Sequence, residues 1–248
     1  MKVVVSVLVR MGSGRLPGKV MRDLCGRPML WHLINRLRQC KLVDEIAIAT
    51  PFTAENNVIA KLCESENVFC HRGSENNVLD RLVGSLEQRS AEIGVVVYGD
   101  NPLIDPVIVD EYVEYFLTNR RYDWIGNDLW TTFPPGMEVE VFSLQSVKDA
   151  NLREVKPEVR EHATLFIRQN PSIYKICNVE AKGRRKRSDL YMGVDTAEDL
   201  EVVTSIMSSF QNCQSFSLED IIAFLDQNPD IAKINQGMHR RWRQYRKI

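Results

Sequence analysis

The chain has 248 residues, of which 44% are hydrophobic, enough to bury the core of one α/β domain or of one domain with a smaller appendage. Its 32 Lys and Arg residues nearly balance its 33 Asp and Glu residues, which argues against wholesale binding to nucleic acid or to an anionic membrane surface. The six cysteines form no C-x-x-C pair, and no run approaches the roughly 18 apolar residues of a membrane span. We therefore expect a cytoplasmic protein in which any anion binding is local.

Strands and helices alternate through the first half of the chain, a pattern typical of a mostly parallel sheet flanked by helices. Runs of β-branched and apolar residues predict strands at 3–9, 45–50, 68–72 and 94–98. Helical periodicity predicts helices at 28–40, 54–67, 76–91 and 106–121. A polar loop follows the first strand without a small-residue cleavage site, so we interpret the N-terminus as a strand and not as a signal peptide.

The pattern changes at about residue 123. Residues 123–179 predict a β-rich excursion with one helix, over 160–169, and an alternating strand that includes Glu138 and Glu140. A strand over 190–194, a helix over 196–210 and a last helical stretch over 217–236 follow, before a basic tail. We divide the chain into a main domain of residues 1–210, with the excursion as an insertion, and a C-terminal helical extension of residues 211–248.

The loop after the first strand, Arg10-Met-Gly-Ser-Gly-Arg-Leu-Pro-Gly-Lys19, almost matches two phosphate loops and matches neither. A dinucleotide-binding G-x-G-x-x-G needs its last glycine one residue earlier, and a Walker A loop needs glycine at Ser13 and a hydroxyl at Val20. A Gly-Ser-Gly turn with Arg10, Arg15 and Lys19 after a strand is suited to wrapping a polyphosphate with backbone N–H groups and cations. Taken alone, such a turn is more often an ordinary loop with solvated charges.

Together with Gly26-Arg-Pro-Met29, this loop resembles the opening of bacterial cytidylyltransferases, R-M-x-S-x-R-L-P-x-K followed by G-x-P-[ML]. The likeness is closest to the spore coat polysaccharide biosynthesis protein F type, with CMP-Kdo synthetases and acylneuraminate cytidylyltransferases as more distant relatives. Later blocks resemble the same family in order, so the resemblance extends from about residue 2 to 210: Arg72-Gly-Ser-Glu-Asn-Asn-Val-Leu-Asp-Arg81, Gly99-Asp-Asn-Pro-Leu-Ile-Asp-Pro106, Pro135-Gly-Met-Glu-Val-Glu-Val-Phe142, Arg160-Glu-His-Ala-Thr164 and Val194-Asp-Thr-Ala-Glu-Asp-Leu200.

The resemblance implies a glycosyltransferase-A-like α/β fold, with a mixed, mostly parallel sheet flanked by helices and an excursion that contributes to a homodimer contact. It also implies a reaction that joins CTP to the anomeric hydroxyl of a sugar, usually an acidic 2-keto-3-deoxy sugar, to give a CMP-sugar and pyrophosphate for surface polysaccharide or glycan assembly. Two other classes stay open. One is a sugar-1-phosphate nucleotidyltransferase using another NTP, whose loops typically carry G-G-x-G-T-R, and the other is a catalytically silent binding protein of the same fold.

In-line displacement at phosphorus needs positioning and charge neutralisation more than covalent help from the protein. By resemblance, Arg10, Arg15 and Lys19 bind the β- and γ-phosphates of the leaving group, and Arg15 and Lys19 are catalytic. The other nucleotide contacts that the resemblance implies are the loop residues Met11, Gly12, Ser13 and Gly14 and the cytosine and ribose block with Arg72, Ser74, Asp80 and Arg81. For Asp80 and Arg81, a surface ion pair on one helix is an equal alternative.

Asp100 and Asp195 each follow a predicted strand, and the carboxyl ends of strands are where such sheets bind ligands. A Mg²⁺ ion shared by these two carboxylates would bridge the α-phosphate and the attacking hydroxyl and lower the pKa of that hydroxyl. We therefore expect both aspartates to be catalytic and Asp100 to lie at the nucleotide as well. The alternative for Asp195 is a helix N-cap.

The sugar side of the site is implied by the later family blocks and comprises Asn101, Glu138, Glu140, Arg160 and His162. Glu138 and Glu140 alternate along one predicted strand, so both point to the same face, and two such carboxylates do not suit a purely apolar core. A structural role for His162 is at least as well supported as a ligand contact. The family more commonly has threonine at Gly14 and cysteine or glutamate at Asn101.

Two basic segments remain, Lys182-Gly-Arg-Arg-Lys-Arg187 and the tail from Arg240 to Lys247. Because the net charge is near zero and no nucleic-acid module is recognisable, we interpret them as a solvated loop and tail and not as a nucleic-acid or membrane surface. The first segment precedes Asp195 closely enough to add positive potential for an anionic substrate.

Overall fold

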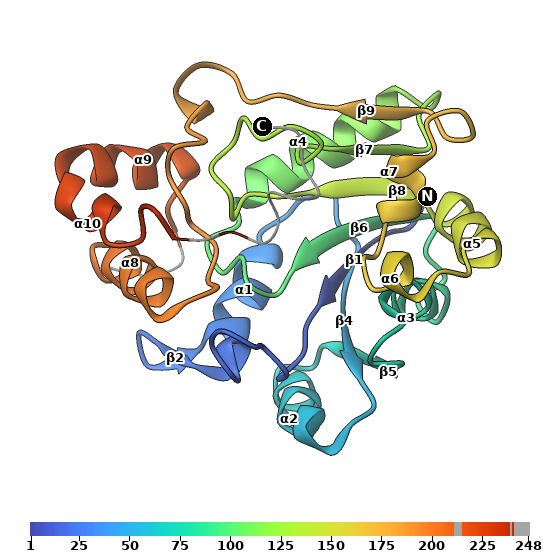
Figure 1. Ribbon diagram of the computed structural model, residues 1–248, viewed down its shortest axis with the longest axis horizontal. Coiled ribbons are helices and arrows are strands. Elements are labelled where there is room, and N and C mark those ends of the chain that lie inside the picture. The colour runs from blue at the N-terminus through green and yellow to red at the C-terminus, as the bar shows by residue number, and fades with distance from the viewer. Residues whose placement is uncertain (211–214, 239, 241–248) are drawn as a thin grey trace.

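The computed structural model describes residues 1–210, 215–238 and 240. A seven-stranded sheet forms its centre, and helices pack on both faces (Figure 1). The strands of this sheet are β1 (Val3–Leu8), β4 (Glu45–Pro51), β5 (Phe69–Gly73), β6 (Ile93–Tyr98), β7 (Trp124–Gly126), β8 (Glu140–Ser143) and β9 (Ile176–Asn178). A separate two-stranded sheet pairs β2 (Asp23–Leu24) with β3 (Arg27–Pro28).

The strand order is β5-β4-β1-β6-β8-β7-β9. The first four of these strands pair in parallel, β8 runs antiparallel to both of its neighbours, and β9 is again parallel to β7. The predicted mixed, mostly parallel sheet flanked by helices is therefore confirmed. The carboxyl ends of β1 and β6, which are adjacent, meet at one edge of the sheet, where parallel sheets bind their ligands.

Alternate residues of the strands face two separate apolar cores, as the pleat requires. Val3, Val5 and Val7 of β1 face one core, and Val4 and Leu8 face the other. The first core is covered by α1 (Met29–Leu37), α2 (Asn57–Ser65), α4 (Pro106–Thr118), α8 (Ala197–Ser208) and α9 (Leu218–Gln227), and the second by α3 (Val78–Glu87), α5 (Leu144–Arg153) and α7 (Leu165–Gln169). The remaining short helices are α6 (Pro157–Arg160), α10 (Pro229–Lys233) and the 3₁₀ turns η1 (Lys19–Met21), η2 (Ala54–Asn56) and η3 (Gly183–Arg185). None of the described helices is both long enough and apolar enough to cross a bilayer.

Residues 123–179 differ from the prediction in their helices and in their relation to the sheet. Their three strands, β7, β8 and β9, extend the central sheet. They contain the three helices α5, α6 and α7, where the sequence predicted one over 160–169, and that predicted helix is split between α6 and α7. Since β8 begins at Glu140, Glu138 lies before the strand and not on it.

The predicted strand over 190–194 is wrong. No strand is assigned there, and the backbone N–H groups of Met192 and Val194 donate to the carbonyls of Pro135 and Asp100 at 2.7 and 2.8 Å. These are isolated bonds between loops and not a ladder, so Asp195 precedes the N-terminus of α8 instead of ending a strand.

The last predicted helix, over 217–236, is two helices, α9 and α10, that meet at Asn228. Pro229 starts α10, and a residue before proline is disfavoured in the helical conformation, so the chain turns there. Phe216 and Leu218 are buried in the same core as the sheet, and the extension packs directly on the main domain. The buried Arg36 of α1 adds a hydrogen bond from its guanidinium to the Phe216 carbonyl at 2.9 Å.

Candidate functional site

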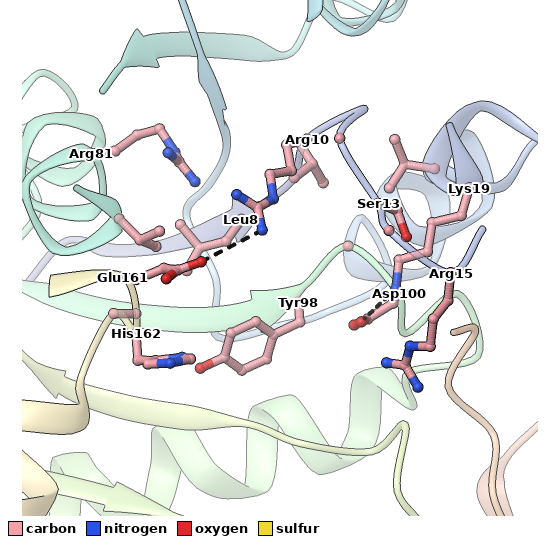
Figure 2. Close-up of a pocket in the computed structure, with 17 residues that line it drawn as sticks. Leu8, Arg10, Ser13, Arg15, Lys19, Arg81, Tyr98, Asp100, Glu161 and His162 are labelled. Atoms are coloured by element: carbon pink, nitrogen blue, oxygen red, sulfur yellow. Dashed lines mark hydrogen bonds and ion pairs between the residues drawn. The ribbon is translucent and has the colours of Figure 1, made fainter. Parts of the chain in front are cut away.

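A cavity of about 370 Å³ opens at the carboxyl ends of β1 and β6, between the loop after β1 and the ends of α3 and α6 (Figure 2). The residues that line it include nine of those predicted from the sequence: Arg10, Gly12, Ser13, Gly14, Arg15, Lys19, Arg81, Asp100 and His162. The structure thus brings together residues from distant parts of the chain, because β1 and β6 are neighbours in the sheet although about 90 residues separate them.

The loop after β1 folds around the carbonyl of Met11. This carbonyl accepts hydrogen bonds from the backbone N–H groups of Ser13 at 2.8 Å and Gly18 at 3.0 Å, while the Met11 N–H donates to Asn56 Oδ1 at 2.8 Å. Gly18 has φ of 67°, a left-handed conformation that favours glycine, just before η1 begins. No atom lies within 4 Å of the position that a Cβ on Gly14 would take, so the loop is open toward the cavity at that point.

Four charged groups converge at one end of the cavity: Lys19, Arg15 and Asp100, which line it (Figure 2), and Asp195, which lies next to them outside the lining. Lys19 Nζ donates to Asp100 Oδ2 at 3.0 Å, to Asp195 Oδ1 at 2.9 Å and to the Val194 carbonyl at 2.7 Å. Arg15 forms an ion pair with the other oxygen of Asp195 at 2.9 Å. Lys19 is the last residue of the loop after β1, Asp100 lies two residues after the end of β6 and Asp195 precedes α8, so the cluster joins three segments.

The pKa shifts in this cluster follow from burial and from the pairing. Burial by itself lowers the pKa of Lys19, but the charges of Asp100 and Asp195 outweigh it, and the pKa is raised. Burial raises the pKa of Asp100, a shift that Lys19 opposes and Asp195 reinforces. Burial also acts to raise the pKa of Asp195, but Lys19, Tyr191 and Arg15 overcome it and lower the pKa. Asp195 is therefore the stronger acid of the pair, and Lys19 carries a full positive charge between them.

Asp195 is held from the N-terminus of α8. Its backbone N–H donates to Asp199 Oδ2 at 2.9 Å, and one of its carboxylate oxygens accepts from the Tyr191 hydroxyl at 2.8 Å. The N-cap of α8 is Thr196, which forms a capping box with Asp199. The N-cap alternative for Asp195 is therefore wrong, and its carboxylate is directed at Lys19.

The donor set of this cluster suits a small divalent cation. The carboxylates of Asp100 and Asp195 approach the same ammonium group, so a position near that point has two oxygen ligands of the kind that Mg²⁺ prefers. In the part of the chain that the structure describes, no group of three or more His, Cys, Asp or Glu side chains is placed to hold a metal. Two carboxylates nevertheless fit Mg²⁺, which usually completes its shell with water and substrate phosphates.

The other end of the cavity is formed by Arg10, Arg81, Tyr98, Glu161 and His162 (Figure 2). Arg10 approaches Glu161 at 3.8 Å. Arg81 is only 2% exposed and donates to the backbone carbonyls of the loop before α3, so the alternative that it forms a surface ion pair is wrong. Burial, and next the charge of Arg10, lower its pKa to about 10. Burial likewise lowers the pKa of His162, so this imidazole is neutral at pH 7.

Several sequence-selected residues lie outside the cavity lining. Arg72 donates to the Thr53 carbonyl at 2.9 Å, and its guanidinium lies 4.6 Å from the ring centre of Phe52. Ser74 accepts from the Asn77 N–H at the start of α3. Asp80 and Arg160 both bond to Asn151 near the end of α5: Asp80 accepts from its amide at 3.2 Å, and Arg160 donates to its carbonyl at 2.8 Å.

Glu138 and Asn101 form a buried pair behind the Asp100 end. The Asn101 amide donates to Glu138 Oε2 at 3.0 Å, and the same oxygen accepts from the Gly136 N–H at 2.9 Å. The charge of Glu138 also contributes to the raised pKa of Asp100. The pair is therefore coupled to the charged cluster, although neither residue lines the cavity.

Glu140 is fully buried, with 0% exposure, and has a different set of partners. It accepts hydrogen bonds from the Tyr98 hydroxyl at 2.8 Å, from Trp124 Nε1 at 3.0 Å and from the Thr164 hydroxyl, and Arg168 lies 3.9 Å away. Tyr98 is the only one of these partners that lines the described cavity. Glu138 and Glu140 thus do not share a surface for a sugar.

Three polar residues at the site were not among those predicted from the sequence. Tyr98 and Glu161 line the cavity, and Tyr191 holds Asp195. Each lies beside or near a residue that the sequence did select: Tyr98 two positions before Asp100, Glu161 directly before His162, and Tyr191 four positions before Asp195. Their closeness in sequence to predicted residues was the only signal that could have pointed to them. Closeness in sequence does not indicate which of several neighbouring side chains faces the cavity.

The two basic segments are more structured than predicted. Arg185 pairs with Glu111 and Glu219, and Arg187 pairs with Asp189 and Asp226. Arg240 is buried, so its assignment to a solvated tail is wrong. The tail beyond it lies outside the described residues.

The family model described as Cytidylyltransferase matches residues 4–239, nearly the whole chain. The chain belongs to the cytidylyltransferase family. The predicted family is therefore confirmed, and the match includes both the charged loop after β1 and the Asp100 cluster.

Individual relatives agree with this membership. The spore coat polysaccharide biosynthesis protein SpsF of Bacillus subtilis is 31% identical over 232 residues, 91% of this chain and 95% of the relative. A 3-deoxy-manno-octulosonate cytidylyltransferase of Trichlorobacter lovleyi is 34% identical over 119 residues, 48% of this chain and 46% of the relative. A solved structure of a cytidylyltransferase from Leptospira borgpetersenii has a TM-score of 0.90 at 29% identity and covers 97% of this chain and 100% of its own. The glycosyltransferase-A-like nucleotidyltransferase fold is confirmed by this likeness.

Proposed function

We propose that this cytidylyltransferase is a CMP-sugar synthetase, which joins CTP to an acidic sugar of the 3-deoxy-2-ulosonic or nonulosonic type and releases pyrophosphate, for surface polysaccharide or glycan assembly. The observation that carries the proposal is the cluster of Lys19, Arg15, Asp100 and Asp195 at the open glycine-containing loop. It combines two cations for the phosphates with two carboxylates for a divalent cation, which is the equipment that phosphoryl transfer needs.

The loop side of the cavity would take the triphosphate. Arg10, Arg15 and Lys19 neutralise the β- and γ-phosphates as they depart, and the backbone of Gly12, Ser13 and Gly14 lies along the same wall. Lys19 is held by two carboxylates before substrate binds, so its ammonium is already placed at the reacting end of the cavity. Positioning of this kind supplies rate without covalent participation of the protein.

Asp100 and Asp195 would hold Mg²⁺ together with the nucleotide. When bound, Mg²⁺ supplies charge neutralisation at the reacting phosphate and makes the attacking sugar hydroxyl more acidic. The lowered pKa of Asp195 keeps its carboxylate ionised and ready to bind a cation. The charge that Lys19 places between the two carboxylates offsets their repulsion while no cation is there.

The sugar class is supported by the far end of the cavity and by a relative. His162, a predicted sugar contact, lines that end beside Arg81, which is predicted to contact the cytosine and ribose. A relative over about half of the chain is named for 3-deoxy-manno-octulosonate, an acidic sugar of the proposed type. The predicted sugar contacts at Asn101 and Glu138 would act from behind the Asp100 cluster, and a contact at Arg160 stays a prediction. Glu140 is fully buried among protein donors, so we do not expect it to touch the sugar.

We also propose that the chain forms a homodimer. Leu152 and Val155, next to α6, are 83% and 80% exposed, and large apolar side chains on a surface mark protein interfaces. A second copy covering this surface would lie close to the His162 end of the cavity, since α6 leads into that residue. Sedimentation equilibrium of the chain measures the oligomeric state, and a monomer at all concentrations would contradict this part of the proposal.

The reaction is tested by measuring pyrophosphate release with each NTP against a panel of ulosonic and nonulosonic acids, with and without Mg²⁺. We expect release with CTP, an acidic sugar and Mg²⁺ together. Activity with UTP and a sugar 1-phosphate, and none with CTP, would favour the sugar-1-phosphate nucleotidyltransferase alternative. No release with any pair, together with no nucleotide binding by calorimetry, would favour a silent binding protein.

The charged cluster is tested by Asp100→Asn. We expect turnover to fall by about 100-fold or more, because a metal contributes several kcal/mol at the reacting phosphate. The fold should persist, since the amide is nearly isosteric and removes the repulsion between Asp100 and Asp195. Asp226→Asn, which changes an exposed carboxylate on α9 in the same way, is the control and should keep the wild-type rate. An Asp100→Asn enzyme near the wild-type rate would mean that the metal assignment is wrong.

A further inference from the structure

The chain returns to the charged cluster after α10, through residues Asn235 and Arg240. Arg240 is 5% exposed, although it belongs to a segment of basic residues near the C-terminus. A buried arginine needs hydrogen-bonding and ionic partners, because the cost of removing its charge from water is large. The partners of Arg240 show what this segment is attached to.

Arg240 binds two groups of the segment that carries Asp195. Its NH1 and NH2 groups donate to the two carboxylate oxygens of Asp199 at 2.7 and 2.8 Å, a bidentate pair in which Asp199 has 0% exposure. The centre of its guanidinium lies 3.4 Å from the ring centre of Tyr191. Asn235 supports the same arrangement, since its amide donates to Asp199 Oδ1 at 2.9 Å and its carbonyl accepts from Arg240 at 3.0 Å.

Tyr191 and Asp199 in turn hold Asp195 from two sides. The Tyr191 hydroxyl donates to the Asp195 carboxylate at 2.8 Å, which fixes the side chain. Asp199 Oδ2 accepts from the backbone N–H groups of Asp195 and Thr196, both at 2.9 Å, which fixes the main chain at the start of α8. Tyr191 and Asp199, which both contact Arg240, are therefore each one hydrogen bond away from Asp195.

We propose that Arg240 is a positioning residue for the divalent-cation site, acting on Asp195 through Tyr191 and Asp199. The inference rests on the proposed function, because it concerns the same pair of carboxylates. Without Arg240, the buried carboxylate of Asp199 loses its charge partner, and the ring of Tyr191 loses the guanidinium packed on it. The Asp195 carboxylate is then less well aimed at the point that it shares with Asp100. Mutation of a residue that orients a metal ligand in this way typically lowers metal affinity by about 10- to 100-fold.

A simpler explanation is that Arg240 only attaches the C-terminal segment to the body. Arg187 provides a matched control, because it also ties the C-terminal helices to the 180–195 segment, through Asp189 and Asp226. The structure gives Arg187 no contact with Tyr191 or Asp199 among its ion pairs and hydrogen bonds in the described residues. Loss of attachment alone would therefore affect Arg187→Ala and Arg240→Ala alike, whereas loss of positioning would affect Arg240→Ala selectively.

The experiment measures binding of Mn²⁺ to the full chain in the presence of CTP by electron paramagnetic resonance, with thermal melting as a check on folding. We expect Arg240→Ala to weaken Mn²⁺ binding by about 10-fold or more and Arg187→Ala to leave it unchanged. Arg240→Lys should restore binding only in part, because an ammonium cannot form the bidentate pair with Asp199. The Mn²⁺ concentration for half-maximal pyrophosphate release should follow the same order: unchanged in Arg187→Ala, higher in Arg240→Lys and highest in Arg240→Ala.

Tyr191→Phe keeps the ring under Arg240 and removes only the hydroxyl that binds Asp195, so it tests the pathway even if Arg240→Ala does not fold. We expect it to weaken Mn²⁺ binding as well, and the double variant Tyr191→Phe/Arg240→Ala to show less than the product of the two single effects. Wild-type Mn²⁺ affinity in Arg240→Ala or in Tyr191→Phe, or an equal loss in Arg187→Ala, would overturn the inference. If the wild-type chain itself binds no Mn²⁺ in the presence of CTP, the proposed function fails. That result differs from those that overturn only the role of Arg240, in which the wild-type chain does bind Mn²⁺.

Discussion

Replacing Glu140 by leucine tests whether this buried carboxylate stabilises the fold or binds the sugar. Leucine keeps most of the side-chain volume and removes both oxygens. The Trp124 indole N–H, now 3.0 Å from Oε2, would be left buried without its acceptor, and the Thr164 and Tyr98 hydroxyls would lose theirs. Arg168 would lose a carboxylate at 3.9 Å, while its closer pair with Asp128 at 3.0 Å would remain.

The size of the effect follows from these contacts. A buried donor left without a partner costs about 1–3 kcal/mol, and the hydroxyls can recover part of their loss by rotating. The closer Asp128 pair limits the loss at Arg168, so we expect Glu140→Leu to lower the free energy of unfolding by about 3–5 kcal/mol. At about 2–4 °C per kcal/mol for a domain of this size, the melting temperature should fall by about 6–20 °C.

Glu140→Gln is the matched control. Its amide oxygen can still accept from Trp124, and the Tyr98 hydroxyl can rotate to accept from the amide nitrogen, so we expect a loss of only about 1–2 kcal/mol. Thermal and guanidinium unfolding give the stabilities, and pyrophosphate release gives the KM for the sugar. Wild-type melting of Glu140→Leu, together with a tenfold or larger increase in the sugar KM, would refute the reasoning and restore Glu140 as a sugar ligand.

Two further predictions concern the cavity wall. Because burial lowers the pKa of His162, its neutral form is favoured in the folded state, so wild-type stability should fall as pH drops below about 6.5, and His162→Asn should lack this step. Urea unfolding at about pH 5 and pH 8 measures it, and equal losses in both proteins would contradict the shift. A Cβ on Gly99 would lie 2.2 Å from Val9 Cγ1 and 3.1 Å from the Leu8 carbonyl, so Gly99→Ala should cost about 1–3 kcal/mol, whereas Gly14→Ala, with no atom within 4 Å, should stay within about 0.5 kcal/mol. Equal melting temperatures for these two variants would contradict this prediction and show that Val9 and Leu8 move aside without cost.

Much of the charged cluster was predictable because it depends on local sequence and on sheet topology. Arg10, Arg15 and Lys19 are close in sequence and follow one strand, and Asp100 follows another. Parallel strands place their carboxyl ends at one edge, so these groups had to approach one another once the strands were recognised. Asp195 also joined them, although the strand predicted before it is absent.

The positions of the residues predicted to bind the sugar were harder to predict, because side-chain direction depends on where an element starts. Glu138 and Glu140 alternate in sequence, but β8 begins only at Glu140, so the two carboxylates bind different partners. Arg160 ends the short helix α6 and bonds to α5, while the next two residues face the cavity. A sequence block that resembles the family therefore indicates which segment lies near the site, but not which of its side chains enters the cavity.

The sequence by itself determined the family, the alternation of strands and helices, and the charged loop, because these are properties of neighbouring residues and of their periodicity. Only the tertiary structure decided that Lys19 lies between two carboxylates and that Glu140 is buried and bonded to the Tyr98 hydroxyl. It also decided that Arg240, assigned from composition to a solvated tail, pairs with Asp199 at a separation of 41 residues. The physical reason is that a charged side chain is stabilised by whichever partner packing brings to it, and that partner is not encoded at any fixed distance along the chain.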